Sequence, residues 1–282
     1  MTVSIAYLGP AGTNTEAAAL AYMNLLQQQS EQKCLLCPYP SVAQTIRAVA
    51  KGEVKLAIVP VENSLEGSVP VTLDTLWQVT TVQIQKALVL PISHALISTV
   101  KTLEEIKTVY SHPQALAQCQ EWMEQYLGNV QLVPTNSTTE AVNQLEKDEL
   151  AGAIASQRAA ELYQVPILAF PINDRPENYT KFWAVSLDNS PGGSHTSLGF
   201  SVPANVPGAL AKPLQLMATR SINLSRIESR PTKRSLGEYL FFIDLECDWR
   251  DTSVKSALQE LSSYTETLKI FGSYDGVTVK PD

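Results

Sequence analysis

The feature that most constrains the fold of this chain is the alternation of short apolar runs with helical segments. The apolar runs predict buried strands at residues 4–8, 34–39, 56–60, 82–90, 95–98, 108–111, 130–133, 153–155 and 179–187. Between them, the pattern predicts helices at residues 13–28, 42–51, 71–79, 138–145 and 157–162, and one that begins at Pro113. Strands that alternate with helices form βαβ units on a mostly parallel sheet. We therefore expect an α/β fold for this part of the chain.

The remainder of the chain predicts a second, smaller domain. Residues 188–194 read Asp-Asn-Ser-Pro-Gly-Gly-Ser, a composition typical of a linker. Beyond it we expect, in order, a strand, a helix, two strands, a helix and a strand, at residues 196–202, 208–221, 224–228, 239–247, 254–264 and 267–274. The order βαββαβ is that of the ferredoxin-like fold.

Composition and charge exclude several classes of protein. A chain of 282 residues that is 44% hydrophobic is long enough for two cores and too apolar to be disordered. A net charge of −7 argues against a nucleic-acid partner, which requires a basic face. No apolar run approaches the roughly 20 residues of a membrane span, and the N-terminus reads as a strand rather than a signal peptide. We expect a cytoplasmic protein without a membrane partner.

Cysteine and histidine residues offer no metal site. Cys34 and Cys37 form one C-x-x-C motif without a second pair, and they overlap a predicted strand, so we expect four reduced cysteines. The three histidines, His94, His112 and His195, lack the spacing of metal ligands. We expect neither a metal nor a cofactor.

Polar residues that follow predicted strands are the candidates for a binding cleft, because ligands bind beyond the carboxyl ends of strands in open α/β sheets. Two of these segments, at Gly12-Thr13 and Ser137-Thr138, also begin helices, whose free N–H groups suit an anion. Each segment alone is equally consistent with a tight turn, a helix cap or an exposed polar loop. The candidates are Gly12, Thr13, Glu62, Asn63, Ser64, Ser111, Gln118, Ser137, Thr138, Thr180 and Lys181.

Taken together and in order, these segments resemble prephenate dehydratase in its form with a C-terminal ACT regulatory domain. The matching motifs are Gly9-Pro10-Ala11-Gly12-Thr13; Glu62-Asn63-Ser64 with Gly67, Val69, Thr72, Asp74 and Leu76; Ser111-x-Pro113-Gln114 with Gln118-Cys119; Asn178-x-Thr180-Lys181-Phe182; Gly208-Ala209-Leu210; and Glu228-Ser229-Arg230-Pro231. The resemblance covers nearly the whole chain. It implies two lobes of the periplasmic-binding-protein type (type II) followed by a ferredoxin-like ACT domain.

The resemblance also implies domain bounds and an activity. The catalytic domain is expected at residues 1–187, with lobe 1 at about 1–76 and 168–187 and lobe 2 at about 77–167, and the ACT domain at residues 195–282. The implied reaction is the decarboxylating dehydration of prephenate to phenylpyruvate without a cofactor. Phenylalanine is the implied effector, and a homodimer or homotetramer the implied assembly.

Residue roles follow from the same resemblance. Thr180 is the implied catalytic residue, and the other candidates in the cleft, apart from Glu62, bind the substrate. Lys181 stands where the family usually has arginine, and strand alternation points it away from Thr180. The implied effector-binding residues are Asn205, Gly208, Ala209, Leu210, Glu228 and Ser229. Pro213 falls inside the predicted helix 208–221, which predicts a late start or a kink.

Glu62 has a role that we infer from its chemistry. It is the only strongly acidic group among the matched cleft positions, and an ionised carboxylate close to a dianionic substrate would oppose binding. We therefore expect Glu62 to be protonated in the complex and to supply the proton that the Thr180 hydroxyl passes to the leaving oxygen.

Two alternatives stay open at this point. Arogenate dehydratase performs the same chemistry on the aminated substrate. A non-catalytic amino-acid sensor would combine the two-lobed domain with the ACT domain and would not turn over prephenate.

Overall fold

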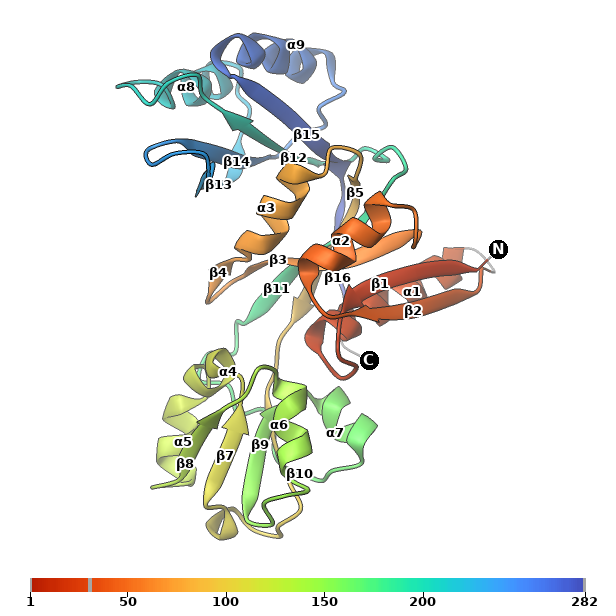
Figure 1. The fold of residues 1–282 in the computed structure, drawn as a ribbon, viewed down its shortest axis with the longest axis vertical. Helices are drawn as coiled ribbons and strands as arrows, with labels where there is room; N and C mark the ends of the chain where they lie inside the picture. Colours follow the sequence, from red (N-terminus) through yellow and green to blue (C-terminus); the bar gives the residue numbers. More distant parts are fainter. Residues whose placement is uncertain (1, 30–31, 281–282) are drawn as a thin grey trace.

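A computed structural model describes residues 2–29 and 32–280. Three sheets are stacked along the long axis of the molecule, with the C-terminal domain at one end, lobe 1 in the middle and lobe 2 at the other end (Figure 1). The expected domain bounds at residues 1 and 282 lie outside the described residues.

Lobe 1 is built on a seven-stranded sheet with the order β16-β5-β11-β3-β1-β2, to which β4 is added beside β3. Helices α1, α2 and α3 cover it. Its elements are β1 (Val3–Leu8), α1 (Asn14–Gln29), β2 (Cys34–Tyr39), α2 (Val42–Ala50), β3 (Leu56–Asn63), β4 (Gly67–Ser68), α3 (Pro70–Gln78), β5 (Gln83–Pro91), β11 (Tyr179–Ser186) and β16 (Gly276–Thr278).

Lobe 2 is built on a five-stranded sheet with the order β10-β6-β9-β7-β8. Small residues fill its buried strand β9, which pairs with β6 on one side and with β7 on the other. Its elements are β6 (Ala95–Ser98), η1 (Leu103–Glu105), β7 (Thr108–Ser111), α4 (Pro113–Ala117), α5 (Gln120–Tyr126), β8 (Gln131–Pro134), α6 (Thr138–Gln144), β9 (Ala151–Ala155), α7 (Gln157–Tyr163) and β10 (Ile167–Ala169).

The chain crosses between the lobes twice, after β5 and before β11. The expected two-lobed fold is confirmed, but its inner bounds are corrected. Strand β5 pairs along its length with β11, so lobe 1 extends beyond residue 76. Strand β10 pairs with β6, so residues 168 and 169 belong to lobe 2. Sequence pattern places a strand but does not tell which sheet it joins.

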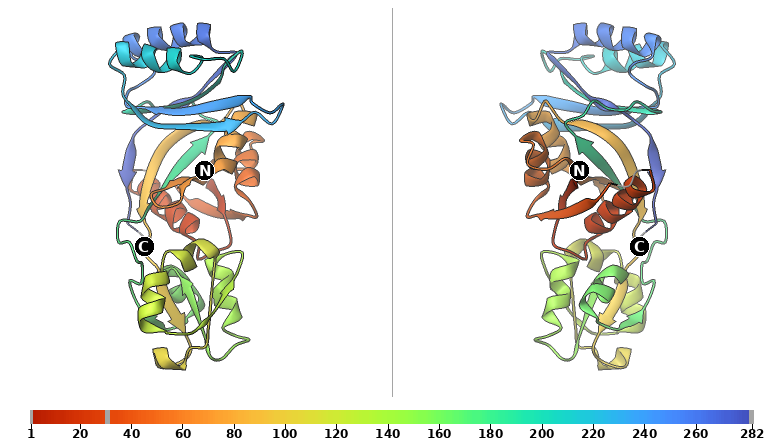
Figure 2. Two further views of the ribbon diagram at one scale, coloured as in Figure 1. Left: turned by 90° about the vertical axis from the view of Figure 1, so that its left-hand side faces the viewer. Right: turned by 90° about the vertical axis from the view of Figure 1, so that its right-hand side faces the viewer.

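The C-terminal domain has the expected βαββαβ order and forms a four-stranded antiparallel sheet, β13-β14-β12-β15. Helices α8 and α9 lie on its outer face, and its other face is turned to lobe 1 (Figure 2). Its elements are β12 (His195–Ser201), α8 (Ala211–Thr219), β13 (Leu224–Pro231), β14 (Tyr239–Leu245), α9 (Thr252–Leu261), η2 (Ser262–Tyr264) and β15 (Thr267–Tyr274).

The end of the chain returns to lobe 1. After β15, strand β16 runs parallel to β5 and extends the seven-stranded sheet at its edge (Figure 1). Val279 is 7% exposed within the core that α1 covers. The expected assignment of residues 276–278 to the ACT domain is therefore corrected, because β16 belongs to the lobe 1 sheet.

Helix α8 confirms the expectation of a late start. It begins at Ala211 and not at residue 208, so Pro213 lies in its first turn. The N–H groups of a first turn have no partner inside the helix, so a proline there removes no helical hydrogen bond. Among residues 2–29 and 32–280, no helix is long and apolar enough to cross a membrane.

Candidate active site

A cavity of about 500 Å³ lies between the two lobes, and six of the eleven expected cleft residues line it. Its wall includes the ends of strands and the starts of helices from both lobes. Of the sequence-predicted cleft residues, the structure brings together six in this wall: Thr13, Asn63, Gln118, Ser137, Thr138 and Thr180. The remaining ones, Gly12, Glu62, Ser64, Ser111 and Lys181, lie outside it.

Thr180 and Asn63 lie side by side on neighbouring strands. They are paired in the register of β11 and β3, and the Asn63 Nδ2 group donates a hydrogen bond to Thr180 Oγ1 at 3.0 Å. The Asn63 Oδ1 atom accepts from the backbone N–H groups of Leu65 and Glu66, both at 3.0 Å, which fixes the orientation of the amide. Because the Thr180 oxygen already accepts from Asn63, its own proton is free to be donated into the cavity.

A chain of amide side chains continues from Asn63 to the opposite lobe. Asn63 Nδ2 also donates to Asn178 Oδ1 at 2.8 Å, and Asn178 Nδ2 donates to Gln118 Oε1 at 2.9 Å. Gln118 Nε2 in turn donates to a carboxylate oxygen of Glu66 at 3.1 Å. Since an ionised carboxylate only accepts hydrogen bonds, Glu66 turns the Gln118 amide so that its oxygen faces Asn178.

His94 is a second partner of Gln118 that sequence reasoning missed. Its Nε2 atom lies 2.9 Å from Gln118 Oε1, so this nitrogen carries the proton and donates. Burial lowers the pKa of the His94 imidazole below its ordinary value, against the opposing effect of the hydrogen bond with Gln118. The spacing of the histidines bears only on a metal site, whereas the structure places His94 in the wall of the cavity as a neutral donor.

Glu62 does not face the cavity, which corrects our expectation of a catalytic acid. A bulge between Lys181 and Phe182 makes Glu62, and not Val61, the partner of Lys181 across the ladder. Paired residues project to the same face of a sheet, so Glu62 shares the face of Lys181, where its charge acts on Arg226 of the C-terminal domain. Among the described residues that line the cavity, Glu66 is the only one with a carboxyl group.

Lys181 also points away from the cavity, as strand alternation predicted. Its Nζ atom lies 3.1 Å from Asp244 Oδ2 in the C-terminal domain. This contact removes Lys181 from the expected substrate-binding set. Among the described residues that line the cavity, none is a lysine or an arginine.

Gly12 and Thr13 lie where the two lobes meet beside the start of α1. The Gly12 carbonyl accepts from Ser156 Oγ at 3.0 Å, and the Gly12 N–H donates to Glu16 at 2.8 Å. Glu16 forms an ion pair across the lobes with Arg158 at 2.9 Å. Gly12 has a φ of +87°, a conformation that favours glycine. It therefore supports the contact between the lobes, while Thr13 lines the cavity.

Three of the expected residues, Ser111, Ser64 and Ser137, hold the surrounding structure together. Ser111 is fully buried and donates to the Ile154 carbonyl at 2.7 Å. Ser64 Oγ donates to the Glu177 carbonyl at 3.1 Å and accepts from the Tyr179 N–H at 2.9 Å, which ties down the loop before Thr180. Ser137 caps α6 through the N–H of Glu140, as predicted, and it also lines the cavity.

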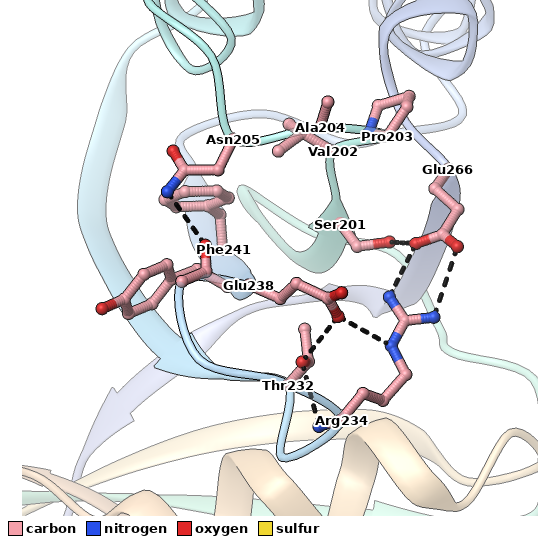
Figure 3. Close-up of a pocket in the computed structure, with 12 residues that line it drawn as sticks. Ser201, Val202, Pro203, Ala204, Asn205, Thr232, Arg234, Glu238, Phe241 and Glu266 are labelled. Atoms are coloured by element: carbon pink, nitrogen blue, oxygen red, sulfur yellow. Dashed lines mark hydrogen bonds and ion pairs between the residues drawn. The ribbon is translucent and has the colours of Figure 1, made fainter.

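The expected effector residues are spread over three places in the C-terminal domain. Asn205 lines a cavity of about 310 Å³, where its amide donates to the Gly237 carbonyl at 2.9 Å. Figure 3 shows Arg234 in this cavity between Glu238 and Glu266, with which it forms ion pairs at 3.2 and 2.9 Å. Neither Gly208, Ala209 nor Leu210 is part of the wall; they form the turn before α8, and Gly208 has a φ of +84°.

Glu228 and Ser229 lie on opposite faces of β13. Glu228 contacts Arg226 at 3.5 Å on the side of lobe 1, while Ser229 is exposed. Neither lines the cavity of Figure 3, so one chain does not bring the expected effector residues together in this cavity. Among the described residues there is no group of three or more histidine, cysteine, aspartate or glutamate side chains that could hold a metal ion.

Comparison with known proteins follows this division of the chain. The family model described as prephenate dehydratase matches residues 5–190, and the ACT domain model matches residues 196–263. The prephenate dehydratase of Lactococcus lactis is 34% identical over 96% of this chain and 97% of its own length. The bifunctional chorismate mutase/prephenate dehydratase of Aquifex aeolicus is 39% identical over 96% of this chain and 73% of its own length.

A solved structure has the same architecture. The prephenate dehydratase of Arthrobacter aurescens, in complex with L-Phe, superimposes with a TM-score of 0.85 at 33% identity, covering 97% of this chain and 90% of the other.

Proposed function

Because this chain belongs to the prephenate dehydratase family, we propose that it converts prephenate to phenylpyruvate in the cavity between its lobes. It is a carbon–oxygen lyase with a two-lobed, periplasmic-binding-protein-like catalytic region of type II and a C-terminal ACT domain. A non-catalytic sensor is not favoured, because family members are enzymes and this chain has Thr180 at the position of the family's catalytic threonine.

The reaction requires two bonds to break in one ring. The bond to the ring carboxylate breaks, carbon dioxide leaves, and the electron pair of that bond enters the ring. The bond to the ring hydroxyl breaks, and the hydroxyl takes up one proton, which comes from solvent, and leaves as water. The enzyme accelerates this by stabilising the leaving oxygen more in the transition state than in the bound substrate.

The observation that carries the proposal is the hydrogen bond that the Thr180 oxygen accepts from Asn63 at the wall of the cavity. Asn63 donates to its oxygen at 3.0 Å, which leaves the Thr180 proton for an acceptor in the cavity. The leaving hydroxyl of the substrate is such an acceptor. We assign to Thr180 the donation of this hydrogen bond, and to Asn63 and Gln118 its orientation.

The substrate carboxylates need partners, and the cavity supplies neutral ones. Residues at the start of α1, Thr13 to Thr15, and the Ser137-Thr138 segment face it from opposite lobes. Backbone N–H groups and hydroxyls there can hold a carboxylate without a mobile cation. A carboxylate that must leave as carbon dioxide would be held back by a strong ion pair, so the lack of a lysine or arginine among the described lining residues suits the reaction.

Control by phenylalanine belongs to the same proposal. The ACT domain match and the L-Phe complex of the Arthrobacter aurescens enzyme support phenylalanine as an effector of this chain. Because one chain does not bring the expected effector residues together in the cavity of Figure 3, we propose that the site is completed by a second copy, in a homodimer or homotetramer. A cytoplasmic location fits a biosynthetic enzyme of this family.

The experiment that tests the function compares turnover of prephenate and arogenate, each with and without phenylalanine. We expect prephenate to be the better substrate, and phenylalanine to change its rate of conversion. A preference for arogenate would mean that the chain carries out the same decarboxylating dehydration on arogenate. Binding of phenylalanine without turnover of either compound would contradict the proposal.

A further inference from the structure

A buried charge cluster lies where the C-terminal domain contacts strand β11. Asp244 of β14 is fully buried, and its carboxylate accepts from Lys181 at 3.1 Å and from Arg226 at 2.9 Å. Ser197 donates to its other oxygen at 2.5 Å. Burial alone would raise the pKa of the Asp244 carboxyl, but Arg226 and Lys181 hold it below its ordinary value. The carboxylate is therefore charged and fully partnered at neutral pH.

Lys181 links this cluster to the active site. It follows Thr180 in β11, and the two side chains project to opposite faces of the sheet, Thr180 into the cavity and Lys181 to Asp244. The ladder between β11 and β3 is bulged between Lys181 and Phe182. The extra residue of this bulge, Val61, lies in β3, while β11 pairs with β5 without interruption from Tyr179 to Ala184. Because a bulge locally disrupts the ladder, the ion pair between Lys181 and Asp244 is an additional contact on β11 beside the bulge.

We propose that Asp244, acting through Lys181, is a positioning residue that sets the place of the Thr180 hydroxyl in the cavity. The ion pair thus connects the C-terminal domain to the reacting group. This inference rests on the proposed function of Thr180. A displacement of about 1 Å in a catalytic group can lower a rate on the order of 100-fold, which makes the strand position worth fixing.

Another contact between the domains offers a matched control. Asp74 of α3 pairs with Lys233 at 2.6 Å and with Arg230 at 3.2 Å, both from the C-terminal domain. Like Lys181, Lys233 pairs with a carboxylate of the other domain that an arginine also contacts. Unlike Lys181, it does not belong to the strand that carries Thr180.

The test is the variant Lys181→Met, which keeps the apolar stem and leaves Asp244 with Arg226 and Ser197 as partners. We expect kcat for prephenate to fall about tenfold or more, while KM stays within about twofold. Amide exchange of the peptide 179–186 should accelerate by at least about tenfold. Lys181→Arg keeps the positive charge, so its kcat and the amide exchange of this peptide should be close to those of the unmodified enzyme.

The control variant Lys233→Met should leave kcat and the exchange of this peptide as in the unmodified enzyme. The proposal is overturned if Lys181→Met has normal kcat and normal exchange, or if Lys233→Met produces the same changes. If the unmodified enzyme does not convert prephenate, the proposed function fails. In that case, the rate of amide exchange of the peptide 179–186 in Lys181→Met still decides whether the ion pair positions the strand.

Discussion

The proposed role of Thr180 as a donor depends on the defined direction of the amides around it. Asn63 donates to its oxygen, and the Asn63 amide is itself fixed by two backbone N–H groups. At the other end of this series of amide side chains, Gln118 donates to Glu66 and accepts from His94, which fixes the orientation of its amide. Each amide therefore has one orientation that satisfies its hydrogen-bond partners, and Thr180 at the cavity wall is the last member of the series.

The two carboxyls near this site should respond differently to substitution. Glu66→Gln allows the amide of Gln118 to turn, so we expect the loss of about one hydrogen bond, roughly 1 kcal/mol, or about a fivefold lower kcat for prephenate. Glu62→Gln should keep the pH profile of kcat, because Glu62 lies on the other face of the sheet. A flattened alkaline limb in Glu62→Gln would restore Glu62 as the acid.

The sequence identified the residues of this site more reliably than the directions in which their side chains point. Motif spacing located Thr180, Asn63 and Gln118 in one cavity. The expectation that Glu62 faces the cavity was wrong because it treats residues 62–64 as a turn after a strand that ends at residue 60. Strand β3 continues to Asn63, so Glu62 and Asn63 project to opposite faces of the sheet. The role of His94 was missed because a single buried histidine leaves no pattern in the sequence.

At the scale of elements, long periodic segments were predictable and short ones were not. Strands such as β2 and helices such as α2 begin where the apolar pattern begins. The strands β4, β10 and β16 were missed because two or three residues are too few to show a period. Of these, β16 attaches the segment after β15 to the sheet of lobe 1, and nothing in its composition tells which sheet it enters.

Strand β16 should stabilise the whole chain although it is short. Val277 and Val279 pack with the core of lobe 1. Ending the chain after Asp275 should lower the free energy of unfolding by about 2–3 kcal/mol, because buried apolar surface is lost. This corresponds to a fall in Tm of roughly 5 °C. A chain that ends after Lys280 is the control, measured in the same thermal scan. An unchanged Tm after Asp275 would show that β16 contributes no stability.

At the scale of the molecule, the domains share one core. Leu240, Phe242, Phe271 and Tyr274 of the C-terminal domain belong to the same buried cluster as Leu73 and Trp183 of lobe 1. The composition of residues 188–194 correctly indicated a boundary along the chain, but it carries no information about packing across that boundary. A chain cut before residue 195 would expose this cluster, so regulation is better studied with substitutions in the full chain.

The central claim is that this chain removes water and carbon dioxide from prephenate with Thr180 as donor, and the most direct test is steady-state formation of phenylpyruvate by three proteins. The unmodified enzyme should form it, and Thr180→Ala should lower kcat roughly 100-fold or more with little change in KM. Thr180→Ser keeps a hydroxyl beside Asn63 and should retain more activity than Thr180→Ala. Normal turnover by Thr180→Ala would contradict the account.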